Sequence, residues 1–264
     1  MDNKVITLKD ASNPITINQD SYLVIDSDVQ TNHMELNILD CSVVVMDMSS
    51  SKSKVFNLRN SNATFVEIIN SNDIENLEIN NDNSEVEYNI IDLYNEDINY
   101  CINENSLSEG SNTSINMASV CYKEKIKNYK INTSNKKGNT VNEINCFGIV
   151  KDKSILNYDV TSLIEKGAKQ SVVRQSSNIL LFDENSLGKN NPVLLIEEND
   201  VKASHGSSIG KIDDDTMFYL CSRGLTRSEA TNLICLGKVE YLIKKINDEK
   251  IKETLINNFK ERMG

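Results

Sequence analysis

The sequence predicts a mainly β protein, with a parallel β-helix (β-solenoid) over residues 1–212 and a small α-helical domain over residues 213–264. Short runs of alternating apolar and polar residues recur from Ile15 to Ile196, and this alternation is typical of strands. The runs begin roughly every ten residues, which leaves no room for crossover helices. The chain contains no Asn-Gly or Asp-Gly pair, which tight hairpins favour. A β-helix is therefore favoured over the alternative, an antiparallel β-sandwich.

The clearest predicted strands are separated by Asn, Asp and Ser. They are Ile15–Ile17, Tyr22–Ile25, Met34–Ile38, Ser42–Met46, Lys54–Leu58, Thr64–Ile69, Ile74–Ile79 and Glu85–Ile91. Asn suits the corners of a stacked solenoid because it tolerates left-handed backbone angles and its amides can ladder between coils. The segment Glu104–Ser114 is the most loop-like interruption, and Asn135–Asn139 predicts a second turn. Both are too short to be domain linkers.

Three helices are predicted after residue 212. Asp213, Asp214 and Asp215 lie where the first helix begins, and carboxylates there meet exposed N–H groups and the positive end of the helix dipole. The apolar face of this helix is predicted to consist of Met217, Phe218 and either Leu220 or Cys221. Arg223-Gly224 indicates its C-terminal end. Thr226-Arg227-Ser228-Glu229 is a capping box for a second helix that continues to Ile246. Asp248–Met263 has one apolar stripe and predicts the third.

The charge balance excludes several classes of partner. The 264 residues carry a formal net charge of −11 at pH 7, which argues against nucleic acid or an anionic membrane. The longest basic cluster, Lys123, Lys125, Lys127 and Lys130, is interleaved with other residues and predicts a solvated face. No apolar stretch reaches the ~18 residues that a membrane-spanning helix needs. The N-terminal segment lacks the pattern of a secretory signal, so a cytoplasmic location is expected.

Six cysteines are present, and each is expected to be a free thiol in a reducing compartment. They are Cys41, Cys101, Cys121, Cys146, Cys221 and Cys235. A small buried hydrophobic side chain is the default interpretation of a free cysteine. None belongs to a C-x-x-C pair, so the sequence predicts no structural zinc site.

Three short motifs surround His205. Gly206–Lys211 is one residue short of the Walker spacing and is followed by Ile212 rather than Ser or Thr, so we expect no nucleotide to be bound by this chain. Asp213–Asp215 are better explained as a helix cap than as a cation site. Ser204-His205 lacks a G-x-S-x-G elbow, which argues against nucleophilic catalysis. The position of His205, between the end of a predicted strand and the start of a helix, favours a functional imidazole.

The stretch Asp200–Gly224, extended by Pro192–Ile196, resembles the core domain shared by SufB and SufD, components of the SUF iron–sulfur cluster assembly machinery. The matching elements are the Pro-x-Leu-x-Ile run, Asp200-Val201, Ser204-His205-Gly206, Gly210, Phe218-Tyr219-Leu220 and Ser222-Arg223-Gly224, followed by the Ala230–Gly237 helix. Lys166-Gly167-Ala168 and Gln175–Leu181 fit more loosely. The rest of the chain agrees only in being rich in predicted strands.

The resemblance implies a right-handed parallel β-helix capped by a helical C-terminal domain. It implies a scaffold that is not an enzyme, on which an iron–sulfur cluster is transiently built near the interface of two β-helix subunits. His205 is then the functional position and a candidate metal ligand. The helical domain is expected to bind a SufC-type ATPase, through Met217, Phe218, Tyr219, Arg223, Gly224, Arg227 and Glu229.

The chain departs from the SufB-like pattern at three positions. SufB-like chains carry Glu at the position of Gly206, whereas His205-Gly206 resembles the SufD version of the motif. Ser176 and Ala203 stand where cysteines of the family are expected. Because clusters are held mainly by thiolates, sometimes with imidazole, this chain is expected to contribute His205 to a site shared with a partner subunit. In a homodimer, remaining cysteines such as Cys121 or Cys146 would have to supply the thiolates, and the homodimer and heterodimer both stay open.

Two other classes of function remain as alternatives. A β-helix enzyme acting on polysaccharide would need paired carboxylates or a cation site, and usually an exported chain. An aromatic content of 6% with no Trp counts against it, because sugars stack on aromatic rings. The second alternative is a solenoid that serves only as a protein-interaction module.

Overall fold

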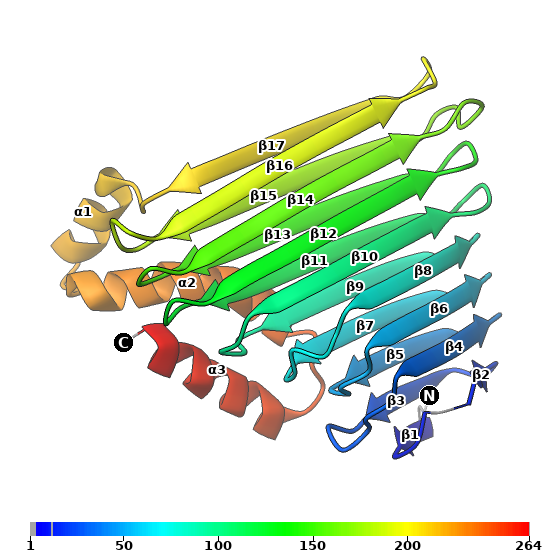
Figure 1. The fold of residues 1–264 in the computed structure, drawn as a ribbon, viewed down its shortest axis with the longest axis horizontal. Coiled ribbons are helices and arrows are strands. Elements are labelled where there is room, and N and C mark those ends of the chain that lie inside the picture. The colour runs from blue at the N-terminus through cyan, green and yellow to red at the C-terminus, as the bar shows by residue number, and fades with distance from the viewer. Residues whose placement is uncertain (1–3, 12, 264) are drawn as a thin grey trace.

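The computed structural model describes residues 4–11 and 13–263, and its strands form two parallel sheets (Figure 1). Consecutive strands alternate between the sheets, and each strand pairs with the strand two positions later. The odd sheet contains β1 (Lys4–Leu8), β3 (Ser21–Ile25), β5 (Ser42–Asp47), β7 (Asn62–Ile69), β9 (Glu85–Asp92), β11 (Asn112–Cys121), β13 (Val141–Val150), β15 (Val172–Leu181) and β17 (Lys202–Gly210). The even sheet contains β2 (Ile15–Ile17), β4 (His33–Leu39), β6 (Ser53–Arg59), β8 (Asn76–Asp82), β10 (Ile98–Ser106), β12 (Ile126–Asn135), β14 (Ile155–Ile164) and β16 (Leu187–Ile196). The predicted parallel β-helix is confirmed, in agreement with the right-handed form that the resemblance implies.

The coils of the solenoid lengthen along the chain. Ser53 pairs with His33, a coil of 20 residues, whereas Val172 pairs with Val141, a coil of 31. The strands lengthen with them, from 5 residues in β3 to 10 in β15. The solenoid is therefore widest at its C-terminal end, as Figure 1 shows.

Side chains that point between the sheets form the main hydrophobic core. Its aromatic stack includes Phe56 and Phe65, whose ring centroids lie 4.8 Å apart. At the corners, Asp40, Asn60 and Asn83 adopt positive φ angles. Their side chains ladder from coil to coil, since Asn60 Nδ2 donates to Asp40 Oδ1 at 3.1 Å and Asn83 Nδ2 donates to Asn60 Oδ1 at 2.9 Å. The structural role predicted for asparagine at the corners is confirmed.

The prediction that the basic cluster forms a solvated face is wrong for Lys127. Lys127 is fully buried between the sheets, and its Nζ lies 2.6 Å from Asp92 Oδ2. It also donates to the carbonyl oxygens of Tyr94 and Val120. On β12, Lys127 alternates with outward residues and shares the inner face with Tyr129, so strand geometry directs its charge inward, where a carboxylate compensates it.

The predicted loop Glu104–Ser114 is wrong at both ends. β10 continues to Ser106 and β11 begins at Asn112, so only the residues between them form the corner. Glu104 is buried, and Ser106 Oγ and Thr113 Oγ1 donate to its Oε1 at 2.9 and 3.0 Å. The polar composition that suggested a loop belongs instead to a hydrogen-bonded cluster inside the solenoid.

The C-terminal helices are α1 (Asp214–Ser222), α2 (Arg227–Ile243) and α3 (Glu249–Met263). Their predicted ends are largely confirmed: Asp213 caps α1, Gly224 has φ +97° after it, and Thr226 with Glu229 forms the capping box of α2. α2 ends at Ile243, before the predicted Ile246. No helix among the described residues has the length and apolar character needed to cross a membrane.

Helices α2 and α3 pack on the outer face of the odd sheet (Figure 1). Apolar residues of the strands, such as Val120 and Ile149, share a second core with Val239 and Leu242 of α2 and Phe259 of α3. The helices are therefore joined to the solenoid through a continuous apolar interface. The proposed boundary between residues 212 and 213 stays a prediction.

Candidate functional site

The last coil of the solenoid, formed by β16 and β17, is called the open end here. Within the described residues, β17 pairs only with β15 and β16 only with β14, so each strand has one free edge. Most side chains of β17 are exposed. Large apolar side chains are also exposed on this coil: Leu187, Leu195, Ile196 and Ile209. Free edges and exposed apolar side chains together are typical of a surface to which another strand can add.

His205 lies within β17 at the open end, so its predicted position after a strand end is wrong. It pairs with Gln175 on β15, which in turn pairs with Ile144 on β13. Gln175 and Ile144 are buried between the sheets, so His205 continues this inward row to the exposed coil. Ser204 faces the opposite side of the strand, because successive side chains alternate. The structure therefore places His205 at the exposed end of the packed interior between the two sheets, here called the lumen. Ser204 does not lie beside it on this face.

The two candidate cysteines lie deeper in the solenoid. Cys146 on β13 is 4% exposed, and burial raises the pKa of its thiol to about 12. Cys121 ends β11 and is fully buried, and burial raises its pKa to about 11. The Cys121 thiol donates to the carbonyl oxygens of Lys125 and Ile155 at 3.2 and 3.4 Å. Burial thus opposes the thiolate form that binds a metal.

The structure does not bring these cysteines to His205. β13 is separated from β17 by β15, so Cys146 is two strand spacings, ~10 Å, from the strand of His205. β11, with Cys121, lies one strand further. Within the described residues, no group of three or more His, Cys, Asp or Glu side chains is placed to hold a metal ion. The assignment of Cys121 and Cys146 as ligands stays a prediction.

The residues predicted to bind the ATPase divide into two groups. Phe218 and Tyr219 on α1 are 76% and 55% exposed, and the Arg223 guanidinium lies over the Tyr219 ring, 5.2 Å from its centroid. These three residues form an exposed apolar and cationic patch, here called the α1 patch. Met217 and Glu229 instead support the helices: Met217 is buried, and the Glu229 carboxylate accepts a hydrogen bond from Thr226 N–H at 2.8 Å.

Gly224 and Arg227 lie between these groups, at the turn that joins α1 to α2. Gly224 has a positive φ that favours glycine, and Arg227 is exposed at the first position of α2. Gly224 therefore shapes the turn, whereas Arg227 extends the exposed surface beside the α1 patch.

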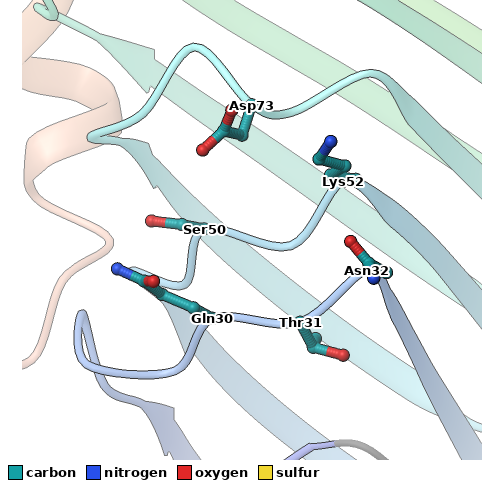
Figure 2. A pocket seen from close by; sticks show the side chains of 6 residues that line it. All are labelled: Gln30, Thr31, Asn32, Ser50, Lys52 and Asp73. Carbon is teal, nitrogen blue, oxygen red and sulfur yellow. The ribbon is translucent and has the colours of Figure 1, made fainter.

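Two hollows lie elsewhere on the surface, and the first lacks the convergent groups of a binding site. The first, of about 400 Å³, lies at the corner loops of the early coils and is lined by Gln30, Thr31, Asn32, Ser50, Lys52 and Asp73. Figure 2 shows that these side chains come from three neighbouring loops and point in different directions. The second, of about 330 Å³, lies between α2 and strands β11, β13 and β15.

Comparison with known proteins identifies the family. Residues 14–238 match the SufBD core domain of the SUF system for FeS cluster assembly. The chain is 36% identical to SufD of Bacillus subtilis over 94 residues, which are 36% of this chain and 22% of that protein. It is 32% identical to SufD of Escherichia coli over 90 residues, 34% of this chain and 21% of that protein.

An archaeal relative gives a similar result. A SufBD family protein of Pyrococcus horikoshii is 34% identical over 100 residues, 36% of this chain and 22% of that protein. The chain thus spans about a fifth of the length of the curated relatives that it matches. The match to the core domain, in contrast, extends over most of the solenoid and into α2. This chain belongs to the SufBD family.

Proposed function

We propose that this chain is a non-enzymatic scaffold subunit of cytoplasmic iron–sulfur cluster assembly. It pairs with a SufB- or SufD-type subunit through the open end and binds a SufC-type ATPase through its C-terminal helices. The observation that carries the proposal is the place of His205, on the exposed last strand of a SufBD core domain and at the mouth of its lumen.

Pairing through the open end follows from the chemistry of strand edges. A free edge presents unpaired N–H and C=O groups, and an added strand satisfies them. Exposed Leu195 and Ile209 supply apolar surface on either sheet of this coil. The partner is a second copy of this chain or a related subunit, and the same edge serves both.

The cluster is the cargo of this assembly and is built at the paired open ends. An imidazole alone holds a cluster weakly, since thiolates are the usual ligands. Cys121 and Cys146 are buried and their thiols resist ionisation. We therefore propose that His205 supplies one ligand and that the partner subunit supplies thiolates.

The ATPase docks on the α1 patch. Aromatic residues and arginine are enriched where protein interfaces derive most of their binding energy, and Phe218, Tyr219 and Arg223 provide this combination. α1 contacts α2, which shares its core with β9, β11 and β13. A shift of the helices caused by ATP hydrolysis in the partner would thereby be transmitted to the solenoid.

The test is the solution mass of the full chain mixed with a SufC-type ATPase from the same genome, measured anaerobically with ATP by light scattering after gel filtration. We expect a complex of defined stoichiometry. The double variant Phe218→Ala and Tyr219→Ala should weaken the complex at least ~10-fold. Val5→Ala, which alters an exposed apolar side chain on β1 at the other end of the solenoid, is the matched control. A wild-type chain that elutes alone would refute the proposal.

A further inference from the structure

Gln175 has a buried oxygen atom without a partner. Its side chain is 3% exposed, and its Nε2 donates to Ser162 Oγ at 2.8 Å and to the Val193 carbonyl oxygen at 3.1 Å. Its Oε1 has no hydrogen-bond partner among the described residues. A buried polar atom left unpaired costs stability, so this oxygen needs a donor.

The orientation of the Gln175 amide is fixed by its neighbours. A backbone carbonyl can only accept hydrogen bonds, so the amide atom that faces the Val193 carbonyl must be the nitrogen. Ser162 Oγ receives a further hydrogen bond from Thr133 Oγ1 at 2.8 Å, which ties the amide to the preceding coil. The unpaired oxygen is therefore held in place rather than free to exchange with the nitrogen.

The adjacent donor in this row is the imidazole of His205. Gln175 and His205 are paired residues on adjacent parallel strands, where side chains on one face stand ~5 Å apart. On the other side of Gln175 the row continues with apolar Ile144. The structure gives no hydrogen bond between the His205 ring and any described residue, so neither ring nitrogen is engaged by another group of the chain.

We propose that Gln175 is the positioning residue of His205: its Oε1 accepts one ring N–H, which leaves the other nitrogen unprotonated and directed out of the open end. Histidines that bind a metal through one ring nitrogen usually donate a hydrogen bond from the N–H of the other. This hydrogen bond fixes both the tautomer and the orientation of the ring. The inference rests on the proposed function only in that His205 is a ligand. The hydrogen bond between His205 and Gln175 forms within one chain and needs no partner subunit.

The test is the tautomer of His205 in the isolated full-length chain, read from imidazole nitrogen NMR shifts at ~pH 8.5, where histidine is neutral. His33 and His205 are the chain's two histidines, so exposed His33 is an internal reference. We expect one dominant tautomer for His205 and a mixed population for His33. Gln175→Met keeps the length of the side chain without the acceptor, and should shift the tautomer ratio of His205 toward that of His33.

Asn190→Leu is the matched control. Asn190 also has an unpaired buried oxygen at the open end. Its Nδ2, however, lies 3.3 Å from the carbonyl oxygens of Ser177 on β15 and Ser208 on β17, and Ser208 is three residues from His205. This variant should leave the His205 tautomer unchanged. Gln175→Leu, which also removes the acceptor oxygen, should shift the His205 tautomer ratio in the same direction and serves if Gln175→Met fails to fold.

Equal tautomer ratios for His205 and His33 in the wild-type chain would overturn the inference. So would a tautomer ratio of His205 that stays the same in the Gln175→Met chain. This readout needs no ATPase and no cluster. A failure to form the ATPase complex with the tautomer intact would therefore refute only the proposed function.

Discussion

The lumen of the solenoid has two different polar regions. In the middle coils, Lys127 is buried against Asp92, and Lys54 lies 2.6 Å from Asp47. At the open end, Gln175 keeps an oxygen without a partner and His205 is exposed. Paired buried groups stabilise one arrangement of the coils, whereas unpaired groups beside solvent are available to bind another group. The difference separates a structural polar interior from a polar end that is suited to function.

The cysteines provide the largest expected contrast between buried and accessible chemistry. Burial raises the pKa of Cys146 to about 12, so at pH 8 only ~10⁻⁴ of it is thiolate. Cys101 is half-buried on the outer face of the even sheet. Because burial suppresses the Cys146 thiolate and shields its sulfur, we expect alkylation of Cys146 to be ~10³-fold slower than that of half-buried Cys101. Timed alkylation of the folded chain with mass spectrometry of its peptides measures the ratio.

All six cysteines should react at similar rates in the urea-unfolded chain, which is the control. If Cys146 or Cys121 reacted as fast as Cys101 in the folded chain, these thiols would become credible cluster ligands, and the contrast between interior and end would be lost.

The next largest effect is expected for Lys127→Met. The change leaves Asp92 as an uncompensated charge in the lumen and should lower the free energy of unfolding by ~3–5 kcal/mol. Lys130→Met is the matched control, because Lys130 lies on the outer face of the same strand and is exposed. It should change stability by less than ~0.5 kcal/mol. Urea titrations measure both values, and equal losses would contradict the structural role of Lys127.

Glu104 departs from this pairing in the middle coils, because it is a buried carboxyl with an unpaired oxygen, Oε2. Burial raises its pKa from 4.5 to about 7. The unfolded chain therefore loses this proton at lower pH than the folded chain does. Stability from this group is complete below pH 4.5 and decreases as the pH rises to about 7, by ~3 kcal/mol in total.

Glu104→Gln removes the titrating proton and keeps the shape of the side chain. At pH 8 this variant should be more stable than the wild type by up to ~3 kcal/mol, and near pH 4.5 the two should be equal. Glu109→Gln, at an exposed corner, should show no such dependence. Denaturant unfolding across this pH range is the measurement. A constant difference between wild type and Glu104→Gln would show that Glu104 does not titrate with folding.

Much of the fold could be predicted from the sequence because its signals are local. Alternation predicted the strands, and Thr226 with Glu229 predicted the start of α2 through a capping box that forms as expected. The packing of the helices was missed, although the odd strands carry the relevant pattern. Val45-Met46 and Ile90-Ile91 place apolar side chains on both faces of their strands, which indicates a sheet covered on both sides.

The errors arose where residue type and strand position disagree. Polarity predicts a solvated face for Lys127 and a loop that begins at Glu104, yet the alternation of their own strands places both side chains inward. The position of Gln175 beside His205 depends on a register between residues 30 apart, which no local pattern specifies. The role of His205 came from the family resemblance, and its place at the mouth of the lumen required the structure.

The smallest effect on stability is expected for His205→Ala. His205 is exposed, and even the loss of the proposed hydrogen bond to Gln175 should cost less than ~1 kcal/mol, because water can reach the open end. The iron and sulfide content of the anaerobically reconstituted complex should nevertheless fall sharply. Ser207→Ala, on the same face of β17, is the control and should change neither. A His205→Ala chain that loses more than ~2 kcal/mol, or that retains full cluster content, would place His205 among the structural residues of the lumen rather than at a functional end.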